Sequence, residues 1–346
     1  MNYRLLGRSG LRVSKISLGT MTFGEEWGWG TAKDEARKIY DAYRAAGGNF
    51  IDTANLYTMG SSEKFVGEFV KGHREEVVIA TKYSNAAAGT DPNAAGNQRK
   101  NMVQAVEASL KRLGTDYIDL YWLHVWDGLT PVDEVMRAFD DLVRQGKVLY
   151  VGVSDAPAWW VAQANTLAEL RGWTPFVGLQ IEYSLLERTV ERELIPMAKA
   201  FGLTVTAWSP LKGGVLSGKY RHKEGNAEAD ARYSSEMMKG FLPERQRQDR
   251  VVAALAQLST ETGHSLAQLS LAWLRFRPVP VIPIIGARRI AQLEDNLASL
   301  TIELSPDQVK RLDEASAVDL GFPYEMYAAE VPSTFRYGGM RDRILA

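Results

Sequence analysis

The stretch NFIDTANLY, residues 49–57, is the most informative starting point for the fold of this chain. Its first part is apolar and strand-like, while Asp52 and Tyr57 place ionisable side chains at and just beyond its C-terminal end. A short run rich in branched and aromatic residues predicts a β-strand. Polar side chains that close such a strand indicate an edge of a sheet where functional groups gather.

The same pattern occurs twice further along the chain. VVIATK (77–82) ends on Lys82, and YIDLYWLH (117–124) ends on His124. Segments with helical periodicity separate the three runs, so the strands are expected to lie parallel and to bring all four polar side chains to one rim. In a (β/α)8 barrel, the C-terminal rim is where catalysis takes place.

Eight strand-like runs occur in all, which is the number that a closed barrel requires. Their near-continuous apolar sequence fits strands buried on both faces, and the amphipathic segments between them fit helices. We predict an α/β fold, a (β/α)8 TIM barrel that forms one domain over residues 1–346. An open doubly wound sheet is the alternative, but no GxGxxG follows the first strand. The runs are ISLGT (16–20), NFIDT (49–53), VVIATK (77–82), IDLYWLH (118–124), VLYVGVS (148–154), FVGLQIEYS (176–184), LTVTAWSP (203–210) and PVIPIIG (280–286).

Some segments stand outside this alternation. The opening residues predict a short hairpin that turns on Gly10. Residues 84–97 and 221–246 are polar and follow predicted strands, so we expect long loops over the active rim, where such loops are usually functional. A final helix capped by Ser305 leads into an aromatic tail that is placed to fold over the pocket.

The composition excludes several classes of function. With 41 Lys and Arg against 42 Asp and Glu, nothing favours nucleic acid or an anionic membrane surface as a partner. The absence of cysteine rules out disulfides and thiolate sites, and the four histidines are too dispersed for a metal cluster, so no metal is predicted. No leader-like segment and no apolar run of the ~20 residues that a membrane span needs is present, which predicts a cytoplasmic protein.

The four side chains at the strand ends suit the reduction of a carbonyl group. A tyrosine with its ordinary pKa of about 10 gives up a proton reluctantly, and a nearby ammonium makes it a better acid. Lys82 is the candidate ammonium for Tyr57, and Asp52 would pair with Lys82. His124 would grip the carbonyl oxygen. Taken singly, each of these residues also fits a structural role at the surface, in a cap or in the core. Buried polar groups need hydrogen-bond partners, however, and the nearest partners for these four side chains are the other three.

Longer segments across the chain resemble the aldo-keto reductases. The resemblance implies a (β/α)8 barrel that binds NADP(H) without a Rossmann motif. It also implies Tyr57 as the general acid, Asp52 and Lys82 as the pair that tunes it, and His124 as the residue that orients the substrate carbonyl. The similar segments are LGTMTFG (18–24), GGNFIDTANLYTMGSSEKFVG (47–67), ATKYS (80–84), LKRLGTDYIDLYWLHVWD (110–127), GKVLYVGVSD (146–155), LQIEYSLLER (179–188), AWSPLKGGVLSGKY (207–220) and IIGARRIAQLEDNL (284–297).

The same resemblance implies a cofactor site that runs along the rim. Trp208 would stack on the nicotinamide ring. Arg288 is the natural partner of a 2′-phosphate, which favours NADP over NAD, although Arg288 and its neighbour Arg289 also fit solvated helix charges. The nicotinamide half is assigned to Gly19, Thr20, Met21, Asp52, Ser154, Gln180 and Trp208, the pyrophosphate to Ser209, Pro210, Leu211, Gly213 and Lys219, and the adenosine to Gly286, Ala287, Arg288, Gln292, Asp295 and Asn296.

One position departs from the family pattern. Asp155 follows Ser154, where the family usually has an asparagine that binds the nicotinamide carboxamide. A carboxylate accepts a hydrogen bond from the amide NH2 but cannot donate one to its carbonyl. Asp155 would either weaken cofactor binding slightly or point into a network of loop residues.

The sequence also contains an incomplete match to the Walker phosphate-binding motif. GGVLSGK (213–219) matches GxxxxGK, but a Walker loop next needs Ser or Thr for magnesium, and residue 220 is Tyr. A loop that lines a phosphate within the reductase is the better interpretation, and an ATP-dependent kinase is disfavoured.

The predicted function is NADPH-dependent reduction of an aldehyde or ketone to the alcohol. The alternative is a subunit that binds NADP(H) for sensing or regulation with little turnover. The substrate is expected to be a small carbonyl compound that is apolar or ring-shaped. Trp27 and Trp29 fit a subunit contact equally well, which leaves a homo-oligomer open. The expected pocket wall is Met21, Phe23, Trp27, Trp29, Tyr83 and Trp126.

Overall fold

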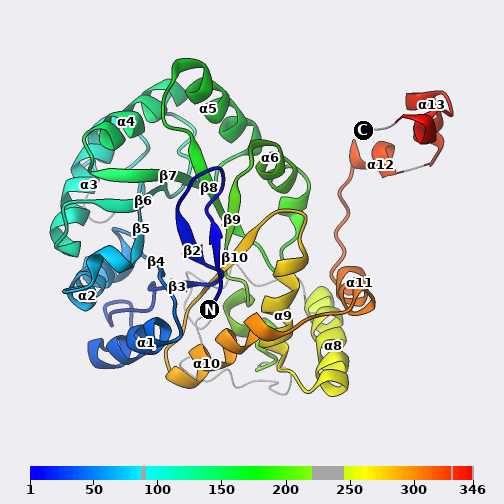
Figure 1. Cartoon of the computed structure of the whole chain (residues 1–346), viewed down its shortest axis with the longest axis horizontal. Helices are drawn as coiled ribbons and strands as arrows, with labels where there is room; N and C mark the ends of the chain where they lie inside the picture. The colour runs from blue at the N-terminus through cyan, green and yellow to red at the C-terminus, as the bar shows by residue number, and fades with distance from the viewer. Residues whose placement is uncertain (87–90, 220–244, 329, 345–346) are drawn as a thin grey trace.

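The computed structural model describes residues 1–86, 91–219, 245–328 and 330–344. Eight parallel strands form a closed barrel in the order β10-β3-β4-β5-β6-β7-β8-β9, and helices surround it as a ring (Figure 1). This confirms the predicted (β/α)8 TIM barrel, and each strand overlaps one of the eight predicted runs. The strands are β3 (Ser17–Gly19), β4 (Phe50–Asp52), β5 (Val78–Tyr83), β6 (Ile118–Leu123), β7 (Val148–Ser154), β8 (Phe176–Glu182), β9 (Thr204–Trp208) and β10 (Val281–Ile285).

Strand β5 shows how the sheet positions its side chains. All of its residues are buried, and alternate side chains point to opposite faces. Val78 and Ala80 pack inside the barrel, whereas Ile79 and Tyr83 pack against the surrounding helices. Lys82 has the same phase as Val78 and Ala80, so it points into the barrel.

The middle of the barrel is filled by Trp122 of β6. Its side chain is fully buried and belongs to the interior cluster. The two neighbouring strands leave room for it, because a Cβ at Gly152 would lie 2.3 Å from Trp122 Cε3 and one at Gly178 would lie 2.8 Å from Trp122 Cη2. The interior is therefore a packed core, as is usual in this fold.

The predicted hairpin is present as β1 (Tyr3–Leu5) and β2 (Arg12–Ser14). It lies across one end of the barrel (Figure 1), and Leu6 and Val13 pack with the interior residues. Gly10 lies in its turn as predicted, but the residue with a positive φ is Gly7, at 56°. A Cβ at Gly7 would come 2.0 Å from the carbonyl oxygen of Val177, so glycine lets the turn pack directly on β8.

The amphipathic segments between the strands form the outer ring of helices. They bury apolar faces against the barrel, as their 3.6-residue period predicts. The cap at Ser305 is confirmed, since its side chain accepts a hydrogen bond from the Gln308 amide in a capping box. The helices are α1 (Lys33–Ala45), α2 (Ser61–Phe69), α3 (Arg99–Leu113), α4 (Val132–Arg144), α5 (Ala158–Arg171), α6 (Leu194–Phe201), α8 (Arg245–Thr262), α9 (Leu266–Trp273), α10 (Ile290–Ala298) and α11 (Pro306–Ala315).

The two predicted loops are described to different extents. In the described part of residues 84–97, the Gly96 amide donates to the Ser84 carbonyl at 2.7 Å, so the segment folds back on the rim. Most of the predicted loop 221–246 lies outside the described residues, and its last two residues belong to α8.

The tail does not fold over the pocket. Its helices α12 (Tyr324–Ala328) and α13 (Glu330–Tyr337) lie outside the ring of helices, at the right of Figure 1. No helix in the described ranges is long and apolar enough to cross a membrane.

Candidate active site

The side chains of Asp52, Tyr57, Lys82 and His124, here called the tetrad, meet at the C-terminal end of the barrel. Lys82 Nζ lies 2.6 Å from Asp52 Oδ2 and donates a hydrogen bond to Tyr57 Oη at 3.1 Å. The rings of Tyr57 and His124 stand edge to face, with centroids 6.0 Å apart. The structure therefore brings together all four residues that the strand ends predicted.

A strained turn places Tyr57 beside Lys82. The short 3-10 helix η1 (Tyr57–Gly60) begins at this tyrosine, and Thr58 and Met59 have φ values of 45° and 55°. Left-handed backbone costs a residue other than glycine roughly 1–3 kcal/mol and persists only where the surroundings hold it. Thr58 is buried, and its hydroxyl donates to the carbonyl of Phe23 at 2.6 Å. This bond fixes the turn and the position of the phenol.

Lys82 is fully buried with all three of its N–H donors satisfied. They go to Asp52 Oδ2, to Tyr57 Oη and to the Thr53 carbonyl at 2.8 Å. Burial alone lowers the pKa of Lys82, but the nearby Asp52 carboxylate and Tyr57 outweigh it, so the pKa of Lys82 is raised. The ammonium is therefore charged at neutral pH.

Asp52 links opposite sides of the barrel. Its Oδ1 accepts a hydrogen bond from Gln180 Nε2 of β8 at 2.9 Å, while its Oδ2 faces Lys82. Each carboxylate oxygen thus has its own partner. Gln180, predicted as a cofactor contact, is held at the rim by this bond.

The imidazole of His124 is neutral. Burial, and secondly the charge of Lys82, hold the pKa of His124 well below its usual value. Its Nδ1 is buried and has no hydrogen-bond partner among the described residues. A neutral imidazole has one N–H donor, which suits a hydrogen bond to a carbonyl oxygen.

The ends of β7 and β9 form the part of the rim predicted to hold nicotinamide. The hydroxyl of Ser154 is buried and has no partner among the described residues, although buried polar groups are nearly always satisfied. Trp208 is partly exposed, and its indole N–H donates to Asp155 Oδ1 at 3.0 Å. An unsatisfied hydroxyl beside an accessible aromatic ring fits a planar amide ligand.

Three further predicted contacts lie at the end of β3. Gly19 and Thr20 are buried, and Met21 is half-buried. The Thr20 hydroxyl donates to the Asp52 carbonyl at 3.0 Å and lies 2.7 Å from the Ser62 hydroxyl. The Thr20 hydroxyl is therefore bound within the fold, so a ligand could contact only the other atoms of this residue.

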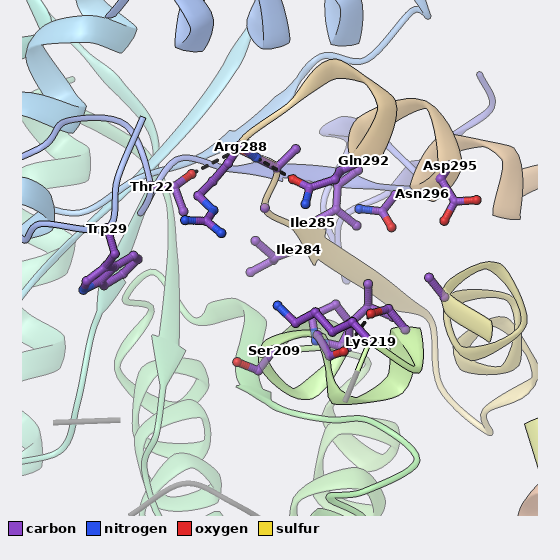
Figure 2. A pocket seen from close by; sticks show the side chains of 18 residues that line it. Thr22, Trp29, Ser209, Lys219, Ile284, Ile285, Arg288, Gln292, Asp295 and Asn296 are labelled. Carbon is purple, nitrogen blue, oxygen red and sulfur yellow. Dashed lines mark hydrogen bonds between the residues drawn. The ribbon is translucent and has the colours of Figure 1, made fainter. Parts of the chain in front are cut away.

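A pocket of about 280 Å³ lies between the segment after β9 and the end of β10, and no tetrad residue lines it. Figure 2 shows the end of β10 and the start of α10 above it and the segment after β9 below it. Every residue predicted for the pyrophosphate and the adenosine lines it, and Thr22, Gly214, Ser217, Ala267, Ile284 and Ile285 line it without having been predicted. The predicted set is Ser209, Pro210, Leu211, Gly213, Lys219, Gly286, Ala287, Arg288, Gln292, Asp295 and Asn296.

This pocket has the features of a phosphate site. The side chains of Arg288 and Lys219 enter it from opposite walls (Figure 2). Gly214 has a φ of 90°, and a Cβ there would come 2.7 Å from Lys219 Cε, so the glycine leaves room for the lysine stem. Two cationic side chains across one cavity suit a ligand with several phosphates.

Comparison with known proteins identifies the family. Residues 15–317 match the model described as the Aldo/keto reductase family. The chain belongs to this family. The membership supports carbonyl reduction with a nicotinamide cofactor as the chemistry of an oxidoreductase.

Individual relatives of this aldo-keto reductase agree with the assignment. The norsolorinic acid reductase of Emericella nidulans is 38% identical over 325 residues, which cover 91% of this chain and 81% of the relative. The aryl-alcohol dehydrogenase [NADP(+)] of Phanerodontia chrysosporium is 38% identical over 333 residues, covering 92% and 86%. An aldo-keto reductase of Aspergillus calidoustus is 35% identical over 359 residues, covering 99% and 88%.

Two predictions about the substrate wall of this aldo-keto reductase are wrong. Tyr83 is fully buried behind the barrel, stacked on Tyr121 at 5.3 Å, with its hydroxyl bonded to the Asn97 carbonyl. Its position directly after Lys82 turns it to the opposite face of the strand. Phe23 is also fully buried, with its ring 6.2 Å from that of Phe69 in α2.

The predicted tryptophans, unlike Tyr83 and Phe23, lie at the rim, close to Tyr57 or to the pocket. Trp27 stands edge to face with Tyr57 at 6.3 Å, and Trp29 packs on Trp27 at 5.5 Å while lining the pocket. Trp126 meets Trp159 of α5 at 5.8 Å. Trp159 was not predicted, although its place just after a strand end of the same kind could have suggested it.

A second ion pair at the rim was also missed. Glu182 ends β8, and its Oε1 lies 2.5 Å from Nζ of Lys212, which is buried in the segment after β9. The strand-end rule that found Asp52 could have found Glu182. Within the described ranges, no group of three or more His, Cys, Asp or Glu side chains could hold a metal ion.

Proposed function

We propose that this protein reduces an aldehyde or ketone with NADPH, and that Tyr57 protonates the carbonyl oxygen. The observation that carries the proposal is the hydrogen bond of 3.1 Å from the buried Lys82 ammonium to Tyr57 Oη. When the phenol gives up its proton, negative charge builds up on an oxygen that already faces a fixed cation. Such preorganised stabilisation of developing charge is a main source of enzymatic rate.

The remaining tetrad residues support this role. Asp52 holds Lys82 in place at 2.6 Å. His124 is neutral, because its pKa is lowered by burial and by Lys82, so it is suited to donate a hydrogen bond and not to be the acid. Tyr57 is therefore the proton donor in this proposal, and His124 orients the carbonyl.

The cofactor in this proposal is NADP(H), which supplies the hydride. Ser154, Gln180 and Trp208 would hold its nicotinamide half, and Arg288 and Lys219 its phosphates. The preference for NADP over NAD rests on two cationic side chains in one pocket, since a 2′-phosphate adds charge that a guanidinium binds well. The relative named as NADP(+)-dependent supports the same choice.

The proposed substrates are aromatic carbonyl compounds. Trp27 stands edge-on to Tyr57, and Trp126 and Trp159 form a second aromatic pair. Aromatic rings favour edge and stacked contacts with flat apolar ligands. A relative named for aryl alcohols is consistent with this class.

The test is turnover of NADPH with a panel of aryl aldehydes and ketones, followed by the loss of reduced-nicotinamide absorbance. Tyr57→Phe should lower kcat by at least ~10²-fold while NADPH still binds, because general acid catalysis contributes about that factor. Tyr3→Phe is the control, since this tyrosine is exposed and lies in the hairpin. Unchanged turnover in Tyr57→Phe would refute the proposal, and tight NADPH binding without turnover on any carbonyl would favour the sensing subunit.

A further inference from the structure

Asp155 is held at the nicotinamide end of the site by three neighbouring segments. Its amide donates to the Gln180 carbonyl at 3.3 Å, its carbonyl accepts from the Trp126 amide at 3.3 Å, and its Oδ1 accepts from the Trp208 indole at 3.0 Å. Its φ of 42° lies in the left-handed region. The carboxylate thus has a fixed position next to Ser154 and Trp208.

Asp155 is also a carboxylate at this rim without a cation of its own among the described residues. Asp52 is paired with Lys82, and Glu182 is paired with Lys212. Among the described residues Asp155 forms no ion pair, and its side-chain partner is the neutral indole of Trp208. The two pairs are each neutral overall, so the Asp155 carboxylate adds an unpaired negative charge next to Trp208 at the nicotinamide end.

The charge on Asp155 depends on pH near neutrality. Asp155 is exposed to solvent at the open rim, yet the protein atoms around its carboxyl group desolvate it and raise the pKa of Asp155 to about 6. The Trp208 hydrogen bond lowers this pKa, Glu182 raises it and Lys82 lowers it. The neutral His124 adds no charge. Asp155 is therefore mainly ionised at pH 8 and mainly protonated at pH 5.

We propose that the Asp155 carboxylate stabilises the oxidised, cationic form of bound nicotinamide and so makes the reduced cofactor a stronger hydride donor. This inference rests on the proposed function, because it needs nicotinamide between Ser154 and Trp208. The hydride leaves with both electrons of its C–H bond and forms the new C–H bond at the carbonyl carbon. The oxygen takes its proton from Tyr57, and the ring that lost the hydride gains one positive charge beside Asp155.

The effect is measured as a ratio of affinities. The full chain is freed of nucleotide, and the Kd of NADP⁺ and of NADPH are measured separately by calorimetry at pH 8. Asp155→Asn removes the charge, keeps a side-chain oxygen for the Trp208 N–H and tolerates left-handed backbone. The preference for NADP⁺ over NADPH should fall about tenfold in Asp155→Asn, which corresponds to about 30 mV in the potential of the bound two-electron couple.

A pH series on the unmodified protein gives an independent measurement. Its preference for NADP⁺ should be present at pH 8 and be lost as the pH falls through about 6, because Asp155 takes up a proton. Titration of the 2′-phosphate is common to both cofactor forms and cancels in the ratio. Asp155→Asn should show a ratio that does not change over this range. A merely structural role of Asp155 would move both affinities together and leave the ratio unchanged.

The outcomes separate this inference from the function on which it rests. The control is Asp116→Asn, an exposed carboxylate just before β6 at the other end of the barrel, which should leave the ratio unchanged. If the protein binds neither form, the proposed function fails and this inference fails with it. If both forms bind and the ratio is the same with and without the Asp155 charge, or does not vary with pH, the inference alone is wrong. Should Asp155→Asn not fold, the pH series decides.

Discussion

Lys82 is the residue on which the site depends most. It is fully buried, yet it carries a charge, because Asp52 lies 2.6 Å from its ammonium. A buried pair of this kind adds little net stability, whereas removing one partner leaves an uncompensated charge in the core. The tetrad is thus a costly arrangement for the fold, which is expected of a site built for chemistry and not for stability.

We expect Lys82→Met to lower the free energy of unfolding by about 3–5 kcal/mol, because Asp52 is left buried without its cation. Turnover should fall by at least ~10²-fold. The double variant Asp52→Asn/Lys82→Met should recover much of the stability but none of the activity. Denaturant unfolding and the NADPH assay measure both.

A matched control is Lys147→Met. This lysine pairs with Glu107 at the surface, where ion pairs contribute about 0–1 kcal/mol, so little change is expected. Wild-type turnover in Lys82→Met would exclude Lys82 from the mechanism.

His124 should make the fold less stable in acid. Its imidazole is neutral in the folded state, because its pKa is held well below the value of about 6.5 expected of the unfolded chain. The unfolded state therefore binds more protons below pH ~6.5, and stability falls there by at most about 1.4 kcal/mol per pH unit. Asp155 has the opposite effect on stability, since its pKa is raised in the folded state. The folded state then binds more protons than the unfolded state, so this group stabilises the fold as the pH falls.

The contribution of His124 is isolated by comparison with His124→Gln, in which Asp155 is unchanged. Thermal or denaturant unfolding of the two proteins should give a difference that grows as the pH falls from 6.5 to 5. A difference independent of pH would contradict the assigned protonation state.

At the scale of the elements, the packing of Trp122 against β7 and β8 fixes the barrel interior. Gly152→Ala should cost about 1–3 kcal/mol, because its Cβ would meet the indole at 2.3 Å. Combining it with Trp122→Phe should cost less than the sum of the two single changes. Gly10→Ala is the control, since a Cβ there meets nothing within 4 Å. Additive costs measured by denaturant unfolding would contradict this contact.

The strands could be predicted from the sequence because parallel strands buried on both faces are continuous apolar runs that end in polar residues. The same rule located Asp52, Lys82 and His124. The rule did not show that β5 continues to Tyr83, nor that this residue faces the surrounding helices while Lys82 faces the barrel interior. It therefore misplaced Tyr83 in the substrate pocket. Nor does a sequence show that the Thr20 hydroxyl is bound within the fold, since its partners at Asp52 and Ser62 lie far along the chain.

At the scale of the molecule, helices α12 and α13 of the tail lie outside the ring of helices. Arg192 donates to the Asp319 carbonyl, and burial, and secondly the charge of Glu193, raise the pKa of Tyr324. Deletion of residues 322–346 should change the free energy of unfolding by less than about 1 kcal/mol and leave turnover intact, because the segment lies outside the ring of helices. The mass in solution should be compared by light scattering, because Phe322 and Phe335 are exposed in the tail. A large loss of stability or activity in a protein of unchanged mass would contradict this division.

The single domain, the cytoplasmic location and a homo-oligomer stay predictions.

The hairpin that covers one end of the barrel has a consequence for proton supply. Leu6 and Val13 seal that end with apolar side chains, and Trp122 fills the space behind them. In the proposed mechanism, the proton that Tyr57 gives up in each cycle would return from the opposite end of the barrel, where the tetrad lies, so solvent must reach the tetrad between one reduction and the next.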